Sequence, residues 1–450
     1  MLKRATKKQF YAAGQQLIAH PAAGLAGEAF IELSRLISHP VYSQGKFSPQ
    51  VTLADGLVEI NSIDLRQIPE IVWQTALCRD IELVLFKGHV GSFGEFLRAI
   101  KKLDWLQFFH AGATVSVRCE ALHSRLYHET KLSNALEDQL KSLGFKAASK
   151  KESDYSIRLY QYKNTLQVAL SLAGKPLFKR GYRHHLSSNA PLAEHIAASL
   201  IHFHLNGLSD RIGQVDTSID RLSGIYVPFA GSGTFGFEGI SQLLGLLPSL
   251  GQRRFAFETM PLFPDKTLSF VKKKLLQRQG NLSILNPSGL LGLSLSQGLS
   301  ISFLEKDQQT FNGLCADVAQ FERIFSGLQE HDNFELHIKK QLGDFFATSS
   351  ALGLNQTESG HVLALINPPY GIRLKHRFQS SASFYHRIAS RLTQLLETCT
   401  SMSGLILLAS DEAFYGFSAG IKAYKGGSLG RSLSFNQGGR HIRAVEFFLS

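Results

Sequence analysis

The sequence predicts an α/β protein with an N-terminal α+β region and a larger C-terminal region built on an open, mostly parallel sheet. Three observations carry this prediction. An apolar run, residues 224–230, meets Gly231-Ser232-Gly233-Thr234 and then a helical stretch. A second apolar run, residues 362–365, is followed closely by Asn367-Pro368-Pro369. The N-terminal region alternates strand-like and helix-like stretches without such a glycine-rich turn. Open sheets bind ligands at the carboxyl ends of their strands, where both motifs are expected.

Length and composition indicate a soluble, multidomain protein with a polyanionic partner. The 450 residues suffice for two or three domains, each with its own core. The chain is 44% hydrophobic and 19% charged, which is ordinary for a globular protein. Its 48 Lys and Arg residues outnumber 36 Asp and Glu residues, giving a formal charge of +12. This excess favours nucleic acid over an acidic membrane surface as the partner.

The cysteines and the N-terminus indicate the cytoplasm. Cys78, Cys119, Cys315 and Cys399 are far apart, so no pair has the spacing of metal ligands. Four cysteines in so long a chain do not form a disulfide framework, which fits a reducing compartment. The N-terminus is basic, but no apolar segment of a signal peptide follows it. No apolar run is long enough to cross a bilayer.

The N-terminal region should be a small α+β unit that binds RNA or protein. Residues 1–50 carry the weakest signal, apart from a helix. The elements expected from apolar spacing and turn residues are a helix at 26–37, a hairpin at 51–60, a helix at 68–77, a strand at 81–86, a helix at 93–103, a strand at 114–119, a helix at 132–143 and paired strands at 156–162 and 166–173.

A basic connector, residues 176–190, should lead into the C-terminal domain. We therefore predict domains at 1–175 and 191–450. The elements expected in the second domain are an Ala-rich helix from Pro191 to about residue 203, a strand at 224–230, a helix at 235–244, a Lys-rich helix after residue 264, strands at 300–304 and 404–409 and a closing antiparallel pair at 432–435 and 442–449.

The stretch Asn367-Pro368-Pro369-Tyr370 has a specific chemical potential. The prolines hold the backbone extended and stiff. The Asn367 side chain and the Pro368 carbonyl offer two acceptors, and Tyr370 offers a flat ring. Two acceptors could hold an exocyclic nucleobase amine pyramidal, with its lone pair aimed at an electrophile. Taken alone, the motif is equally well explained as a Pro-rich turn after a strand.

Several motifs together resemble a known enzyme family. Asn367-Pro368-Pro369-Tyr370 resembles the amino-methyltransferase signature of class I S-adenosylmethionine (SAM) enzymes. Pro228 to Thr234, with Glu238, resembles their SAM motif. Phe255-Ala256-Phe257-Glu258 resembles an insertion of the L family of large-subunit ribosomal RNA (guanine-N2) methyltransferases. Motifs that resemble the RNA-binding THUMP module with its ferredoxin-like segment, and the link that follows it, lie at residues 112–117, 124–128, 166–174, 179–183 and 190–194.

The resemblance implies a seven-stranded Rossmann-like SAM methyltransferase domain after the ferredoxin-like and THUMP region. It implies methyl transfer to guanine N2 in RNA, with 23S ribosomal RNA favoured. Asn367, Pro368 and Tyr370 would hold the base, and no metal is implied. Glu305 would accept the ribose hydroxyls of SAM and Asp344 its adenine amine. The residues implied to bind the cofactor are Pro191, Pro228, Phe229, Gly231, Gly233, Thr234, Glu305, Asp344, Phe345 and Asn367.

Two alternatives stay open at this point. A related enzyme would methylate a guanine in tRNA, or an adenine or cytosine amine. The other alternative arises at Val227, which stands where the family usually has Asp before the Pro. A chain that lacks this carboxylate could be an inactive, RNA-binding assembly factor. The sequence does not predict the modified nucleotide or the oligomeric state.

Overall fold

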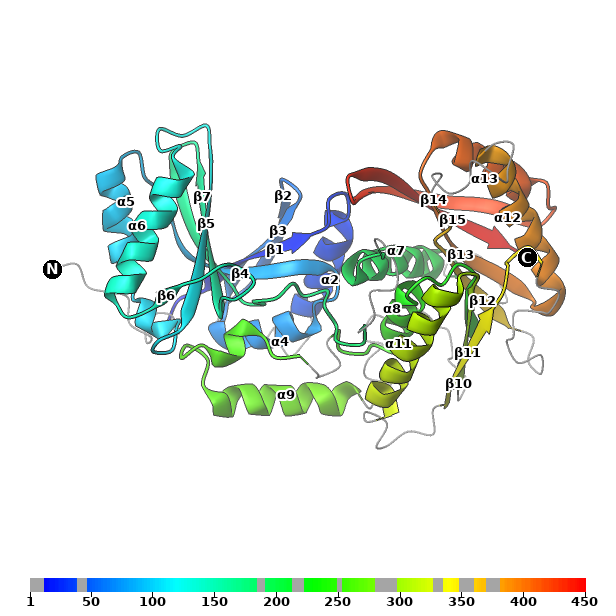
Figure 1. Cartoon of the computed structure of the whole chain (residues 1–450), viewed down its shortest axis with the longest axis horizontal. Coiled ribbons are helices and arrows are strands. Elements are labelled where there is room, and N and C mark those ends of the chain that lie inside the picture. The colour runs from blue at the N-terminus through cyan, green and yellow to red at the C-terminus, as the bar shows by residue number, and fades with distance from the viewer. Residues whose placement is uncertain are drawn as a thin grey trace. The chain divides into compact units, whose positions relative to one another are not determined.

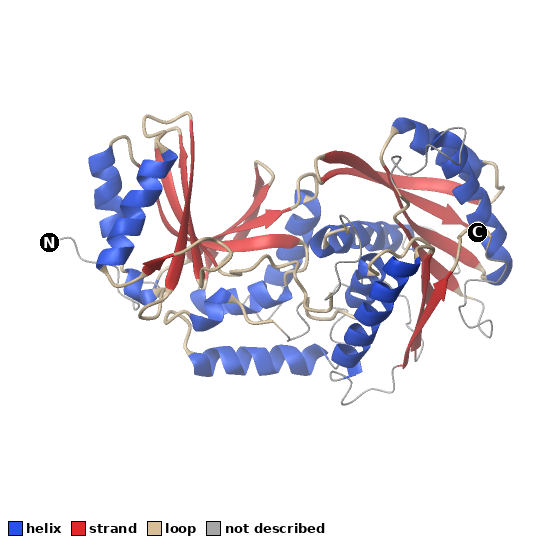
Figure 2. Cartoon of the chain, in the orientation of Figure 1, coloured by secondary structure: helices blue, strands red, loops and turns tan. Residues whose placement is uncertain are grey.

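The computed structural model describes residues 12–38, 47–183, 191–212, 222–248, 253–279, 298–326, 335–347, 360–369 and 381–450 (Figure 1). The chain forms two compact units, each of which contains a mixed arrangement of helices and strands (Figure 2). The first unit comprises residues 1–21, 29–177 and 253–275, and the second comprises residues 22–28, 178–252 and 276–450. None of the helices in the described ranges is long and apolar enough to span a membrane.

The first unit is built on an eight-stranded sheet in the order β2-β3-β1-β4-β8-β7-β5-β6. Its pairs are antiparallel except β5–β6 and β5–β7, which are parallel. The strands are β1 (Gln15–Pro21), β2 (Gln50–Ala54), β3 (Leu57–Ile63), β4 (Cys78–His89), β5 (Thr114–Leu122), β6 (Lys146–Ala147), β7 (Tyr155–Tyr162) and β8 (Thr165–Ser171). The helices that accompany them are α2 (Ala26–Ser38), η1 (Leu65–Gln67), α4 (Ile68–Gln74), α5 (Phe93–Lys101), η2 (Trp105–Gln107), α6 (Glu129–Ser142), η3 (Ala256–Thr259) and α9 (Asp265–Gln279).

Local sequence signals explain most elements of the first unit. The β2–β3 hairpin turns at Asp55, whose φ is 49°, and the β7–β8 hairpin turns at Lys163 and Asn164, with φ of 47° and 61°. Asp and Asn tolerate this left-handed region better than most residues. Ser92 caps α5 by accepting a hydrogen bond from the Glu95 N–H (3.3 Å). The predicted hairpins and helices are therefore confirmed in this unit.

The second unit is built on a seven-stranded sheet in the order β11-β10-β9-β12-β13-β15-β14, as predicted. All neighbours from β11 to β13 are parallel, whereas β15 is antiparallel to both β13 and β14. The strands are β9 (Leu222–Val227), β10 (Gly298–Glu305), β11 (Glu335–Leu342), β12 (His361–Ile366), β13 (Ser401–Leu408), β14 (Gly427–Gln437) and β15 (Arg440–Leu449). The helices are α7 (Glu194–Ile212), α8 (Thr234–Leu243), α11 (Gln308–Ser326), α12 (Ser381–Leu395), η4 (Leu396–Thr398) and α13 (Asp411–Lys422).

The central strands of this sheet are buried on both faces, which explains their continuous apolar sequences. Alternate residues of β12 enter different cores: Leu363 and Leu365 pack with residues of α7, α8 and α11, whereas Ala364 and Ile366 pack with α12 and α13. Figure 1 shows these two groups of helices on opposite faces of the sheet. The second unit is therefore a three-layer αβα sandwich.

The two units are not contiguous in sequence. Residues 22–28 follow β1 of the first unit but pack in the second, where Leu25 is fully buried in the core and the Asn436 N–H donates to Ala23 O (3.3 Å). Residues 253–275 lie between α8 and β10 in sequence but pack in the first unit. These two segments differ from the contiguous domains, 1–175 and 191–450, that the sequence predicts. Between residues 177 and 178 the chain passes from the first unit to the second, and this boundary lies within the expected connector, 176–190.

Candidate functional site

The strand register places the main sequence motifs at one edge of the second sheet. β9 lies between β10 and β12, and all three strands run parallel. Tyr226 of β9 pairs with Ala364 of β12, so both strands end at the same edge. The turn that contains Gly231 and the segment that begins with Asn367 therefore leave the sheet side by side, as the sequence predicts for its two motifs.

The glycine-rich turn after β9 has a backbone that requires glycine. Gly231 and Gly233 have φ of 55° and 73°, in the left-handed region. A Cβ atom added to Gly231 would meet no other atom within 4 Å, so open space lies beside the turn. Gly233 immediately precedes α8, which begins at Thr234. An open turn that leads into a helix N-terminus allows a ligand to approach the backbone closely.

Glu305, at the end of β10, contacts this turn directly. Its Oε2 accepts a hydrogen bond from the Gly231 N–H (2.8 Å). Its Oε1 accepts from the Lys306 and Asp307 N–H groups, both at 2.9 Å. The neighbouring acid has another role, because Asp307 Oδ1 accepts from the Thr310 N–H (2.8 Å) and caps α11. The two carboxylates can therefore be tested separately.

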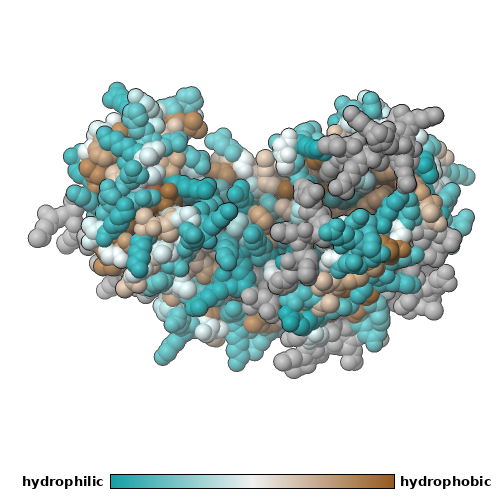
Figure 3. Space-filling view, viewed as in Figure 1, coloured by the Kyte–Doolittle hydropathy of each residue, from teal (hydrophilic) through white to brown (hydrophobic). Residues whose placement is uncertain are grey.

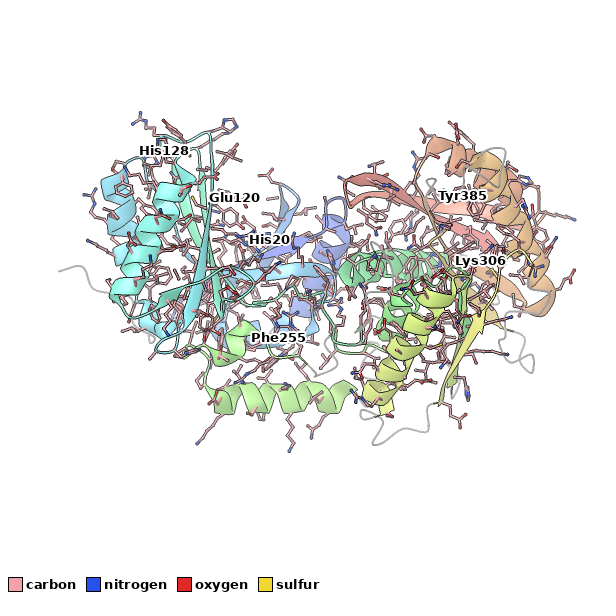
Figure 4. All side chains as sticks on the ribbon, in the orientation of Figure 1. His20, Glu120, His128, Phe255, Lys306 and Tyr385 are labelled. Atoms are coloured by element: carbon pink, nitrogen blue, oxygen red, sulfur yellow. The ribbon has the colours of Figure 1, made fainter. Side chains whose placement is uncertain are left out.

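Asp344 lies after β11 at the same edge. Its Oδ1 accepts from the Phe346 N–H (3.0 Å). Its Oδ2 pairs with the ammonium of Lys306, which directly follows β10 and is labelled in Figure 4. Phe345 is buried, with its ring centroid 5.2 Å from that of Phe229 in the turn after β9. The structure thus brings the two predicted aromatic residues together, next to the predicted adenine acceptor.

The connector residues bind the helix that follows the glycine-rich turn. Arg180 and Glu238 of α8 are both almost fully buried and pair at 3.3 Å. The Tyr182 hydroxyl donates to the same Glu238 carboxylate (2.7 Å). Burial and the adjacent carboxylate raise the pKa of Tyr182 well above its ordinary value, so its hydroxyl remains a donor. This arrangement fixes the orientation of α8 and hence of the turn before it.

Arg183 links three segments around the start of α8. Its Nη2 donates to Thr234 Oγ1 (2.6 Å) and to the carbonyl of Leu192 (3.1 Å), and it pairs with Glu194 at 3.3 Å. Pro191 directly precedes Leu192, so the predicted cofactor residues Pro191 and Thr234 are brought together through this side chain. The sequence placed Arg183 in a linker motif but gave it no role in the site. The only sequence signal that could have pointed to Arg183 is the basic composition of connector residues 179–183.

The predicted base-holding motif is described only in part. Asn367 is half-buried and Pro368 is buried, immediately beyond β12. Tyr370 lies outside the described residues. Val227, where a carboxylate is usual in the family, is buried in the core of the second unit. The described residues contain no cluster of His, Cys, Asp and Glu suited to a metal ion.

Comparison with curated proteins identifies relatives that are RNA methyltransferases by name. No protein-family model matches the chain. A candidate RNA methyltransferase of Synechocystis sp. is 30% identical over 175 residues, which are 38% of this chain and 42% of the relative. A ribosomal RNA large subunit methyltransferase K/L of Colwellia psychrerythraea is 26% identical over 228 residues, which are 46% of this chain and 30% of the relative. The matched part of the chain therefore spans less than half the length of these relatives, whose names confirm the resemblance to large-subunit ribosomal RNA methyltransferases.

Solved structures match nearly the whole chain. A candidate methyltransferase in complex with S-adenosylhomocysteine (SAH) gives a TM-score of 0.65 at 18% identity, covering 96% of this chain and 98% of that one. The chain has a Rossmann-like methyltransferase fold. A candidate N6-adenine-specific DNA methylase from Listeria monocytogenes gives a TM-score of 0.64 at 16% identity, covering 98% of each chain. The first name suggests no substrate and the second suggests adenine in DNA, so the methyltransferase fold does not by itself identify the base.

Proposed function

We propose that the protein transfers a methyl group from SAM to the exocyclic N2 of a guanine in RNA, with 23S ribosomal RNA the favoured substrate. The observation that carries the proposal is the convergence of the glycine-rich turn, Glu305, Asp344 and Asn367-Pro368 at one edge of a methyltransferase sheet. The names of the large-subunit ribosomal RNA methyltransferases among the relatives support RNA as the substrate class. The choice of guanine N2 rests on the motifs that resemble the L family.

The residues at this edge fit SAM. The positive-φ turn at Gly231 has open space beside it, as a closely approaching ligand requires. Glu305 would accept the ribose hydroxyls, since its carboxylate already lies at the end of the second strand of the βαβ unit. Asp344 would accept the adenine amine, and Phe345 would pack against the base. When bound there, SAM would supply an electrophilic methyl group on a sulfonium sulfur.

The chain's own contribution is to orient the nucleophile. Asn367 Oδ1 and the Pro368 carbonyl would accept the two N–H bonds of the guanine amine and direct its lone pair toward the methyl carbon. In that step the nitrogen–carbon bond forms, the carbon–sulfur bond breaks with its electrons going to sulfur, and the nitrogen then loses one proton to solvent. The target base would leave its stack to reach these acceptors. Rate enhancement would come mainly from proximity and alignment.

An Asn367→Ala variant tests this role. It removes one of two acceptors, so methyl transfer to RNA should fall at least 100-fold, by analogy with the loss of one preorganised polar contact in a transition state, roughly 10²–10³. SAM affinity, measured by calorimetry, should change little. Asn312→Ala is the matched control, because Asn312 is an exposed asparagine on α11 of the same unit. Full activity of Asn367→Ala would refute the assignment.

Nucleoside analysis identifies the substrate. The protein would be incubated with SAM labelled in its methyl group and, separately, with unmodified 23S ribosomal RNA and with tRNA. Digestion should release labelled N2-methylguanosine from the ribosomal RNA. Label in tRNA alone, or in methylated adenosine or cytidine, would support a related amino-methyltransferase instead.

A second candidate function, an RNA-binding assembly factor without catalysis, is favoured by one observation. Val227 is a buried apolar residue, so no carboxylate extends from this position. Calorimetry with SAM separates the two functions. Binding of SAM would favour the enzyme, and RNA binding without any SAM binding would favour the assembly factor.

A further inference from the structure

The segment 253–275 interrupts the methyltransferase sequence but packs on the first unit. The Phe257 N–H donates to the Leu172 carbonyl (3.1 Å), which follows β8. The Phe257 ring lies edge-on to Trp73, with centroids 5.1 Å apart. The Tyr155 hydroxyl donates to the Thr259 carbonyl (3.0 Å). These contacts with three elements hold the segment firmly against the sheet of the first unit; Figure 4 labels Phe255 at its beginning.

The helix α9 continues this segment and is anchored by its inner face. Leu268 and Leu275 are buried, with exposed fractions of 6% and 2%. Lys272 lies 3.9 Å from the carboxylate of Glu258, within the same segment. The opposite face of α9 remains in contact with solvent. Figure 3 shows hydrophilic side chains in this region, and Figure 4 shows nitrogen-tipped side chains extending outward from α9.

The outer face of α9 combines an exposed aromatic ring with positive charge. Phe270 is 69% exposed, one of the most exposed large hydrophobic side chains in the described part of the chain. Lys266, Lys273 and Lys274 stand four residues before it, three after it and four after it. On a helix these positions are its neighbours, so the ring is surrounded by ammonium groups. A single exposed apolar residue is common on protein surfaces. The ring is informative here because a flat aromatic face beside several cations can stack on a base while the cations contact phosphates.

We propose that this face of α9, defined by Lys266, Phe270, Lys273 and Lys274, binds a single-stranded segment of the RNA substrate. The lysines would contact phosphates, and the Phe270 ring would stack on an unpaired base. This inference rests on the proposed function for the identity of the partner. It adds a contact surface within the first unit and separate from the edge where the methyl group would be transferred.

Charge and geometry favour nucleic acid over a protein partner. A protein-docking helix usually presents several apolar side chains at i, i+3, i+4 and i+7, whereas this face has a single ring. A lone aromatic ring among cations is the combination by which proteins bind single strands without reading sequence. The firm attachment of the segment also reduces the ordering needed on binding, because the ring and charges are already presented together.

The aromatic contribution is measured with Phe270→Ala and Phe270→Trp in the full chain. Fluorescence anisotropy would measure the affinity for a labelled oligouridylate of about 20 nucleotides. This length exceeds the roughly 4–16 nucleotides that a typical single-strand-binding domain covers. Phe270→Ala should weaken binding by roughly 5- to 150-fold, the equivalent of losing one stacked base. Phe270→Trp should retain it. Leu106→Ala is the control, because Leu106 is another exposed hydrophobic residue, 54% exposed, in the same unit.

The electrostatic contribution is measured through the salt dependence. The triple variant Lys266→Gln, Lys273→Gln, Lys274→Gln should lower the slope of log affinity against log salt by about 2, since each phosphate contact on a single strand contributes about 0.7. Glutamine keeps the helix propensity close to that of lysine. A triple control with the same loss of charge replaces three exposed lysines of the second unit, Lys339, Lys422 and Lys425.

The outcomes separate this inference from the proposed function. Equal salt slopes for the two triple variants, or unchanged affinity in Phe270→Ala, would overturn the assignment of α9 to RNA and leave protein docking as its explanation. A loss of oligouridylate binding in the α9 variants would support the inference even if the chain failed to bind SAM or to transfer a methyl group. In that case the proposed enzyme would fail while the RNA surface remained.

Discussion

The buried pair of Arg180 and Glu238 should stabilise the second unit only as long as both partners are present. The pair is 3.3 Å apart, with side chains that are 1% and 3% exposed. Arg180→Met leaves the Glu238 carboxylate buried without its cation, and breaking such a pair costs roughly 3–5 kcal/mol. The Tyr182 hydroxyl still donates to that carboxylate at 2.7 Å, so we expect a value in the lower half of this range.

Removing both charges should restore much of the lost stability. In the double variant Arg180→Met, Glu238→Met no buried charge remains, and apolar replacement of a buried pair is often neutral. Tyr182→Phe is added to this double variant because the Tyr182 hydroxyl loses its acceptor when Glu238 is replaced. A buried hydroxyl without an acceptor costs about 1–3 kcal/mol. The triple variant should therefore be more stable than either single charge variant. A more exposed pair in the same unit, Arg443 and Asp411, with side chains that are 37% and 76% exposed, provides the control: Arg443→Met should cost less than about 1 kcal/mol.

The assay must report on the second unit. Both tryptophans, Trp73 and Trp105, belong to the first unit, so intrinsic tryptophan fluorescence follows the other half of the chain. Hydrogen exchange measured by mass spectrometry on the peptide covering residues 234–243 follows α8 directly. Its amides should exchange faster in either single charge variant and return toward wild-type rates in the triple variant. If the effects of the single changes simply add, the residues do not act as a unit and the reasoning fails.

Three further predictions follow from neighbouring residues. Glu305→Ala should weaken SAM binding in calorimetry by at least about tenfold, because the glycine-rich turn loses a charged acceptor. The control Asp307→Ala removes a helix cap and should cost about 0.5–2 kcal/mol of stability without weakening SAM binding. Equal SAM affinities of the two variants would contradict the assignment of Glu305. Gly236→Ala should lower the denaturation midpoint more than Gly239→Ala, since only the former Cβ would press into a buried ring, and overpacking costs about 1–3 kcal/mol; the opposite order would contradict this packing. Burial, with a nearby histidine, lowers the pKa of His361 to about 3, so the unfolded chain binds this proton first as pH falls. Stability should fall between about pH 6.5 and 3 by up to about 1.4 kcal/mol per pH unit, and His361→Asn should flatten that slope in denaturation series; an unchanged slope would show that His361 titrates normally.

The parts of the fold that the sequence predicts well are those with strong local signals. β9 and β12 were predicted because each contains an apolar run and is followed within two residues by proline. β11 was missed because it alternates between exposed and half-buried residues, and its sequence contains two lysines in place of an apolar run. β1 was missed because polar residues interrupt it; His20 is one of them, and it pairs with the buried Glu82 of the neighbouring strand at 3.0 Å.

The candidate site was predictable in its motifs but not in its supports. Glu305 and Asn367 follow strands, and the register of a parallel sheet is enough to place them at one edge. The bond between Glu305 and the Gly231 N–H spans 74 residues, and that between Tyr182 and Glu238 spans 56. Such long-range pairs have no periodicity or spacing that a sequence displays. Arg183 was assigned only to the linker because its contact with Thr234 also spans many residues, 51 in sequence.

The placement of residues 253–275 delays the point during synthesis at which the first unit can finish folding. The first unit is interrupted at residue 177 and resumes only at residue 253. At a synthesis rate of about 5–20 residues per second, the nascent first unit waits several seconds for its final piece. During that interval the carbonyls of Leu172 and Ala173 lack the N–H donors that Phe257 and Ala256 of η3 later provide. A recombinant fragment that stops at the connector would remain permanently in this unfinished form.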